Sequence, residues 1–440
     1  MSQPSVRNAV IIGGNRIPFA RSNTAYVNAS NQDMFTAALE GLVARFGLQG
    51  ERLGAVAGGA VLKHSKDFNL VRESVLGSSL DPATPAYDVQ MACATGMEAI
   101  GSLANKIKLG QIESGIGGGV DTTSDAPIAV SESLRGILLE LSRARSTKAK
   151  LAALAKIRPS HLAPSAPGTG EPRTGLSMGD HQALTTKAWN ITREAQDELA
   201  LASHLNLAAA YDRGFFNDLL TPFKGLSRDN NLRADSTLEK LAKLKPAFGK
   251  NLGEAATMTA GNSTPLTDGA STVLLGSEDF AAAHDLPMLA NFVDFEAAAV
   301  DFVHGAEGLL MAPAYATARL LERNNLSLQD FDFYEIHEAF AGTVLATLAA
   351  WEDEQFCREK LGLDAPLGAI DRGKLNVNGS SLAAGHPFAA TGGRIVATTA
   401  QQLHRRRAEL LAAGEDRPVR ALVSVCAAGG LGVAAILEAV

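Results

Sequence analysis

Three short stretches rich in small residues, far apart in the chain, each carry one reactive side chain. Cys93 lies in Met91–Gly96, His386 follows a glycine, and Cys426 precedes the small residues 427–430. A thiolate is the attacking species in cysteine chemistry, so Cys93 needs a base, which His386 could supply. A helix that begins just after Cys93 would lower the pKa of its thiol. A Cys/His hydrolase needs no second thiol, whereas a reaction that moves a carbon-bound proton and protonates a leaving thiolate does benefit from one. The pattern predicts a Cys/His/Cys active site.

Composition limits what else the chain can be. Its 440 residues are 46% hydrophobic and 20% charged, which predicts a globular protein with more than one core layer. With 40 Lys and Arg against 47 Asp and Glu, it has no general footprint for nucleic acid, so an anionic ligand requires a local basic patch. Three cysteines, two of them in the motifs above, form no disulfide framework and indicate a reducing compartment. The start at Met1–Pro4 runs directly into the strand-like Ala9–Ile12, so we expect no signal peptide and a cytoplasmic location.

Strand-like runs alternate with helical periodicity at both ends of the chain, which indicates parallel sheets covered by helices. In the first half, strands are expected at 9–12, 54–61, 86–89 and 115–120, and helices at 33–46 and 96–108. In the last third, strands are expected at 289–295, 331–336 and 374–376, and helices at 312–324, 339–354 and 389–405. The glycine-rich stretch 114–120 resembles 424–433, and a duplicated α/β unit explains both.

The C-terminal segment 421–440 carries a single charge, Glu438, and its hydropathy alone would allow a membrane span. Gly429, Gly430 and Gly432 interrupt it. We therefore expect two buried strands around a glycine turn.

The segment 131–158 differs from the rest of this acidic chain because it is basic and amphipathic. Two glutamates and several leucines are interleaved with its basic residues, which are Arg135, Arg143, Arg145, Lys148, Lys150, Lys156 and Arg158. Prolines and glycines over 159–172 then prevent regular structure. Such a segment suits an anionic ligand, an acidic lipid surface or a partner protein; the alternative is an ordinary solvated helix.

Four motifs together resemble the thiolase family, and the resemblance extends along the whole chain. They occur in the family's order as Cys93–Gly96, His337–Phe340, Gly385–Gly392 and Cys426–Gly430. The resemblance implies an α/β thiolase fold, in which duplicated βαβαβ halves form a five-layered α-β-α-β-α core with an inserted loop domain. It places the N-terminal half at 1–121 plus 267–287, the loop domain at 122–266 and the C-terminal half at 288–440.

The resemblance also implies a role for each site residue. Cys93 is the nucleophile, His386 the base and an oxyanion donor, and Cys426 the acid/base. His337 and the backbone N–H groups of Cys93 and Ala428 complete two oxyanion sites. The contacts to coenzyme A (CoA) are expected at Met178, Ala260, Thr264 and Phe340, the first from a Met-Gly element and the next two from the segment 260–264. The implied site has no metal ion and no prosthetic group, and CoA is a substrate.

The implied activity is CoA-dependent thiolytic cleavage of 3-ketoacyl-CoA by ping-pong cysteine catalysis. His337 stands where many biosynthetic thiolases have Asn, and the segments 386–390 and 426–430 also resemble those of the thiolase subunit of fatty-acid β-oxidation complexes. Both features favour degradation. Three alternatives are a biosynthetic acetoacetyl-CoA thiolase, a decarboxylating ketosynthase with a Cys/His/His site, and a non-catalytic CoA or lipid carrier. Cys426 would have no role in a ketosynthase. The implied partners are acyl-CoA and CoA, a second copy in a homodimer or a dimer of dimers, and a hydratase/dehydrogenase subunit or a peripheral membrane surface docked on 131–158.

Overall fold

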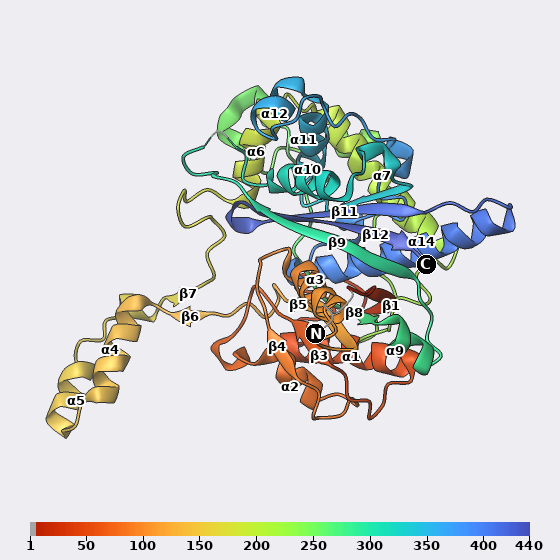
Figure 1. The fold of residues 1–440 in the computed structure, drawn as a ribbon. Coiled ribbons are helices and arrows are strands. Elements are labelled where there is room, and N and C mark those ends of the chain that lie inside the picture. Colours follow the sequence, from red (N-terminus) through yellow and green to blue (C-terminus); the bar gives the residue numbers. More distant parts are fainter. Residues whose placement is uncertain (1–5, 306) are drawn as a thin grey trace.

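The first half of the chain forms a five-stranded mixed sheet and not the parallel sheet that its alternating strands and helices predict, because the strand that follows the long insertion is antiparallel to both of its neighbours. The computed structural model describes residues 6–305 and 307–440 (Figure 1). The strand order is β1-β8-β5-β3-β4, where β5 is antiparallel to β8 and β3 is parallel to both β4 and β5. The strands are β1 (Val10–Arg16), β3 (Ala55–Gly58), β4 (Ala86–Asp88), β5 (Ser114–Asp121) and β8 (Thr267–Gly276), and the short β2 (Ala20–Arg21) pairs with β8.

The second half repeats this topology. Its strand order is β9-β12-β11-β10, with β11 antiparallel to β12 and parallel to β10. These strands are β9 (Ala290–Ala299), β10 (Phe333–Ile336), β11 (Arg420–Ala427) and β12 (Leu431–Ala439). The predicted duplication is thus visible in the order of the strands, and a short pairing between β1 and β9 joins the two sheets along one edge.

Helices cover both sheets and fill the space between them, giving the five layers that the thiolase fold predicts (Figure 1). The central layer consists of α3 (Thr95–Lys108) and α14 (Thr391–Ala412), which touch each other and both sheets. The outer face of the first sheet is covered by α1 (Asn31–Phe46) and α2 (Leu70–Leu76), and that of the second by α10 (Ala312–Asn324) and α11 (Ala341–Glu352). Each interface is a separate cluster of buried apolar side chains, so burial on both faces explains why these strands are so apolar.

The long insertion between β5 and β8 has two parts. Helices α6 (Met178–Ala188), α7 (Arg193–Asp212) and α8 (Leu238–Ala242) lie near α11. Helices α4 (Glu132–Arg143) and α5 (Thr147–Leu154) instead form a hairpin that projects from the body on the ribbon of β6 (Ala129–Val130) and β7 (Pro164–Ser165) (Figure 1). The remaining helices are α9 (Glu278–Ala283), α12 (Glu354–Glu359) and α13 (Ser381–Ala384).

Several expected elements differ from the structure. The strand expected at 374–376 is wrong: only Leu375 makes a bridge, to Tyr334, because Asn376 turns the chain at φ 47°. The helix expected over 339–354 ends at Glu352, and Asp353 caps a second helix, α12. The C-terminal segment forms two antiparallel strands, as predicted. Among the described residues, no helix combines the length and the apolar character needed to cross a membrane.

Candidate active site

Cys93 lies in a tight turn between β4 and α3. The residue before it, Ala92, has φ 46°, a left-handed conformation that is uncommon outside glycine. Thr95 holds this conformation, because its hydroxyl donates to the Ala92 carbonyl at 2.7 Å and accepts from the Met91 N–H at 2.8 Å. Backbone strain maintained by surrounding contacts is common at reactive sites. The turn leaves the Cys93 side chain partly exposed, just before the first turn of α3.

The beginnings of α3 and α14 meet at backbone distance. A Cβ on Gly96 would stand 2.6 Å from the Ala389 carbonyl oxygen, and one on Gly392 would clash with the Met97 nitrogen. Glycine at both positions therefore allows an approach that any side chain would block. This contact brings the loop that carries His386 onto the nucleophile turn, although the two are far apart in sequence.

His386 contacts Cys93 directly. Its Nε2 lies 3.1 Å from the Cys93 Sγ, and its Nδ1 lies 2.6 Å from the Thr391 hydroxyl oxygen. The loop is also fixed by Asp121, whose buried carboxylate accepts the Ala389 N–H at 2.9 Å. The nucleophile and the base predicted from the sequence are thus brought into hydrogen-bonding distance.

Burial favours the neutral forms of both partners. Although the Cys93 side chain is partly exposed, the loss of solvation around its sulfur raises the pKa of the thiol to about 12, against the opposing effect of a hydrogen bond from the Ala428 N–H. Burial and the charge of Arg394 lower the pKa of His386 to about 3. The expectation that the start of α3 lowers the pKa of Cys93 is therefore wrong in its net direction, because the loss of solvation outweighs the nearby N–H groups. Both shifts favour a neutral thiol and a neutral imidazole in the resting enzyme.

Cys426, next to the end of β11, is buried close to Cys93. Burial, and then the charge of Cys93, raise the pKa of its thiol above the ordinary range. Its side chain belongs to an apolar cluster that includes Phe340 and is bordered by Met178. Cys357, the third cysteine, is buried elsewhere, and its Sγ lies 3.4 Å from the Ala350 carbonyl oxygen.

His337 stacks beside His386, with ring centroids 4.2 Å apart at an angle of 45°. It is buried, and burial followed by the charges of His386 and Arg394 lowers its pKa well below the usual value. Its Nδ1 lies 2.7 Å from the Ser381 hydroxyl oxygen. Its Nε2 is buried without a hydrogen-bond partner among the described residues, so a neutral ring with its proton there presents a free donor.

The small residues after Cys426 form a turn that presents the Ala428 N–H to Cys93. Gly429 follows at φ 80°, a conformation that suits glycine, and its N–H donates to the buried carboxylate of Glu171 at 2.8 Å. Glu171 belongs to the insertion, just before α6. Sequence reasoning missed it, because a single glutamate in a proline- and glycine-rich stretch gives no signal of its partner.

The residues expected to contact CoA come from three elements. Met178 begins α6 and borders the apolar cluster that contains Cys426, and the buried Phe340 belongs to that cluster. The Thr264 N–H donates to the Ala339 carbonyl at 3.1 Å, while Ala260 is exposed on a neighbouring turn. The segment 260–264 thus lies against the residues that follow His337.

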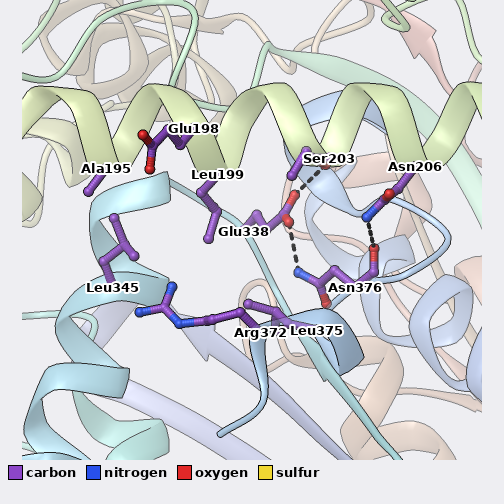
Figure 2. Close-up of a pocket in the computed structure, with 11 residues that line it drawn as sticks. Ala195, Glu198, Leu199, Ser203, Asn206, Glu338, Leu345, Arg372, Leu375 and Asn376 are labelled. Carbon is purple, nitrogen blue, oxygen red and sulfur yellow. Dashed lines mark hydrogen bonds between the residues drawn. The ribbon is translucent and has the colours of Figure 1, made fainter. Parts of the chain in front are cut away.

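The side chain of Glu338 connects α7, the turn at Asn376 and α13. Its buried carboxylate accepts from Ser203 on α7 at 2.7 Å, from the Asn376 amide at 2.7 Å and from the Leu382 N–H at 3.1 Å. Figure 2 shows Glu338 and Asn376 at an open pocket of about 460 Å³ beside α7. That pocket is lined by neither cysteine of the site nor by either histidine, so it is distinct from the cluster around Cys93.

Comparisons with known proteins agree with this architecture. Family models match the thiolase N-terminal domain over residues 9–279 and the thiolase C-terminal domain over residues 286–439. A 3-ketoacyl-CoA thiolase of Yersinia pestis is 40% identical over 98% of this chain and 96% of its own length. The acetyl-CoA acetyltransferase of Bacillus anthracis is 30% identical, with a TM-score of 0.79 over 99% of this chain and all of its own. Human mitochondrial 3-ketoacyl-CoA thiolase, solved with CoA, is 26% identical, with a TM-score of 0.79 over 99% of each chain.

The fold, with its duplicated halves around a central helical layer, defines an acyltransferase of the thiolase type. The chain belongs to the thiolase family, as its motifs predict.

Proposed function

We propose that this protein cleaves 3-ketoacyl-CoA with free CoA, releasing acetyl-CoA and a shortened acyl-CoA. The observation that carries the proposal is the buried second thiol, Cys426, beside the Cys93–His386 pair. A group near the nucleophile that can give and take a proton is what carbon–carbon cleavage requires and what a hydrolase or ketosynthase lacks. The relatives named as 3-ketoacyl-CoA thiolases support this reaction.

In the first half-reaction, Cys93 attacks the keto carbon of the substrate while His386 takes the thiol proton at Nε2. The oxyanion on that carbon accepts hydrogen bonds from the backbone N–H groups of Cys93 and Ala428, and the negative charge that develops on the thioester oxygen of the departing acetyl-CoA accepts hydrogen bonds from His386 and from His337. The bond between the keto carbon and the α-carbon then breaks. Its electron pair leaves with acetyl-CoA, whose α-carbon takes a proton from Cys426. The acyl group stays on Cys93 as a thioester.

In the second half-reaction, the Cys426 thiolate removes the proton from the thiol of an incoming CoA. The CoA sulfur attacks the thioester, and the oxyanion is stabilised by the backbone N–H groups of Cys93 and Ala428. When this intermediate collapses, Cys93 leaves as a thiolate and recovers its proton from His386. CoA would be held by Met178 and Phe340 beside the apolar cluster and by the segment 260–264.

We assign the activity to fatty-acid β-oxidation because His337 replaces the Asn of many biosynthetic thiolases. The test is an assay of acetoacetyl-CoA and a long-chain 3-ketoacyl-CoA, each with free CoA. We expect acetyl-CoA from both, with faster turnover of the long-chain substrate. Activity on acetoacetyl-CoA alone would favour the biosynthetic alternative. Release of CO₂ from malonyl-CoA without thiolysis would favour the ketosynthase, and no turnover at all would favour the carrier.

We also propose that the chain forms a homodimer or a dimer of dimers. Strand β4 is the last strand of its sheet and leads directly into the nucleophile turn. Its outer edge pairs with no other strand among the described residues and could pair with a second copy, which would also support the turn that holds Cys93. Sedimentation at micromolar concentration should show a species of at least twice 45.9 kDa. A monomer alone would contradict this.

The projecting hairpin α4–α5 is proposed to bind an anionic membrane surface. Of its apolar residues, Ile137 and Ala153 are buried, whereas Leu138, Leu139, Leu151 and Leu154 are 39–62% exposed. Arg135 and Lys156 form ion pairs with Glu132 and Glu140. The four basic residues between them, Arg143, Arg145, Lys148 and Lys150, make no ion pair within the described part of the chain. Exposed leucines beside free cationic groups suit an acidic lipid surface better than a polar protein face.

Vesicle flotation tests the hairpin. Reversing the charge of Arg143, Arg145, Lys148 and Lys150 should weaken binding to vesicles rich in phosphatidylserine, and salt should weaken binding of the parent because the Debye length is about 10 Å at 0.1 M. Activity on soluble short-chain substrate should not change. A matched control reverses four exposed basic residues elsewhere that also make no ion pair within the described part of the chain, namely Arg52, Lys66, Lys187 and Arg372. Loss of co-purification with a hydratase/dehydrogenase subunit, without any effect on vesicles, would assign the surface to that partner instead.

A further inference from the structure

The two histidines of the site make different contacts through Nδ1. The Nδ1 of His386 faces the Thr391 hydroxyl, and the Nδ1 of His337 faces the Ser381 hydroxyl. A neutral imidazole carries one N–H, so the role of Nδ1 decides whether Nε2 accepts or donates a hydrogen bond. For His386 the neighbour of Nε2 is the Cys93 thiol, whose hydrogen needs an acceptor. His386 therefore carries its proton on Nδ1 and donates it to Thr391.

The hydroxyl of Ser381 has the opposite role. The Nη2 of Arg394 donates to the Ser381 Oγ at 3.0 Å. Arginine is a donor only, so this contact occupies a lone pair of Oγ and leaves the hydroxyl hydrogen to be donated. Among the described residues, the one acceptor recorded within hydrogen-bonding distance of Oγ is the Nδ1 of His337. Ser381 then donates to Nδ1, and the proton of His337 lies on Nε2.

Arg394 is held in this position by burial. It is 3% exposed, and the same Nη2 donates to the Ser380 hydroxyl at 3.1 Å. It lies three residues after Thr391 in the first turn of α14, so one helical turn orients both histidines. The unpartnered, buried Nε2 of His337 agrees with a donor that is kept free for a ligand.

We propose that Ser381, oriented by Arg394, is a positioning residue that fixes His337 in the tautomer protonated on Nε2, opposite to that of His386. One ring then accepts the thiol proton, while the other donates to the negative charge that develops on the thioester oxygen of the departing acetyl-CoA. Without the Ser381 hydroxyl, His337 could move its proton to Nδ1 and point a lone pair at the developing negative charge. This inference rests on the proposed function for the meaning of the donor, although the tautomer itself can be measured without substrate.

Nitrogen-15 NMR of protein labelled in its histidines measures the tautomers directly. Long-range proton–nitrogen correlations identify the protonated ring nitrogen, and His337→Asn assigns the signal. We expect His337 protonated on Nε2 and His386 on Nδ1. Protonation of His337 on Nδ1 would overturn the inference. Failure of the proposed function would be seen separately, as a parent protein without thiolysis.

Kinetics test the consequence. Ser381→Ala should lower kcat by about 10-fold, a part of the 10²–10³ that a full oxyanion donor provides, with little change in KM for CoA. Ser380→Ala is the matched control: it also removes a hydroxyl bound to Arg394 but has no contact with His337, so it should stay near the parent. In a His337→Asn background the donor is an amide without tautomers, so Ser381→Ala should cause no further loss. An equal loss in both backgrounds would show that Ser381 has a merely structural role.

Discussion

The two halves of the fold place different chemistry at corresponding positions. In the first half, Cys93 precedes the central helix α3 and Asp121 ends β5. In the second, His386 precedes the central helix α14 and Cys426 is next to the end of β11. The first half thus contributes one reactive group and one buried carboxylate, while the second contributes the acid–base groups. The two halves have the same order of elements. Because the beginnings of their central helices meet, the reactive side chains of both halves lie close together.

The halves also differ in the strand that follows β3 in the first half and β10 in the second. In the first half, the chain continues beyond β4 and the Val89 N–H donates to the Gly58 carbonyl at 2.7 Å. A Cβ on Gly59, the residue after β3, would clash with the Val89 carbonyl oxygen. In the second half, the corresponding strand is reduced to the Leu375 bridge, and the residue after β10 is His337. Gly59 and His337 therefore occupy corresponding positions. The first half has room only for glycine there, whereas the shortened strand in the second half leaves space for a histidine side chain.

Removing the one reactive group of the first half should have the largest effect. Cys93→Ala should abolish turnover, because neither other cysteine lies in the nucleophile turn, while CoA binding and the fold should be nearly unchanged. Mass spectrometry of the parent after treatment with acetyl-CoA should show an acetyl group on Cys93. An adduct on Cys357 instead would contradict the assignment.

The corresponding change in the second half should have the next largest effect. Cys426→Ser keeps the size of the side chain but provides a much weaker acid, so thiolysis and condensation should both fall by about 10² or more. Slow acylation of Cys93 should remain, and its rate can be measured by quenched-flow mass spectrometry. Equal activity of variant and parent would favour the ketosynthase alternative, in which Cys426 has no role.

The sequence predicted the reactive groups better than it predicted what holds them. Cys93, His386 and Cys426 could be found because each lies in a motif with small neighbours. Glu171 and Ser381 could not, because each acts through one long-range hydrogen bond that no local pattern encodes. The same holds for the fold. Long, strongly periodic helices are predicted close to their observed positions. The strand predicted at 374–376 is instead a turn, in which the Asn376 side chain donates to the Ile336 carbonyl and the Glu338 carboxylate.

The direction of the Cys93 pKa shift also could not be predicted from the sequence, because it depends on how the folded chain packs around the sulfur. This direction leads to a third prediction. Because burial raises the pKa of Cys93 to about 12, its thiolate fraction should rise about tenfold per pH unit throughout the neutral range. The rate of Cys93 alkylation by iodoacetamide, followed by peptide mapping, should rise in proportion between pH 6 and 9, without a plateau. Cys93→Ala corrects for the other cysteines. A plateau near pH 7 would indicate a thiolate–imidazolium pair.

The smallest predicted effect concerns Asp121, which ends β5 in the first half. Its carboxylate accepts the N–H groups of Val61, Leu62 and Ala389 and so fixes the loop that carries His386. In Asp121→Asn an amide N–H₂ must face at least one of these donors, which should cost about 1–3 kcal/mol of stability and lower kcat several-fold.

The pH dependence of Asp121→Asn separates this role from general destabilisation. Burial raises the pKa of Asp121 from the ordinary 3.8 to about 7, so the folded protein binds a proton more readily than the unfolded chain does. The ionised carboxylate therefore costs stability above pH 7, and this cost diminishes as the pH falls toward 4. Denaturant unfolding should show the parent gaining stability relative to the variant over that range. A constant difference between them would mean that the Asp121 carboxylate is ionised throughout, with its N–H contacts outweighing its burial, and the first half would then place a permanent negative charge near Cys93.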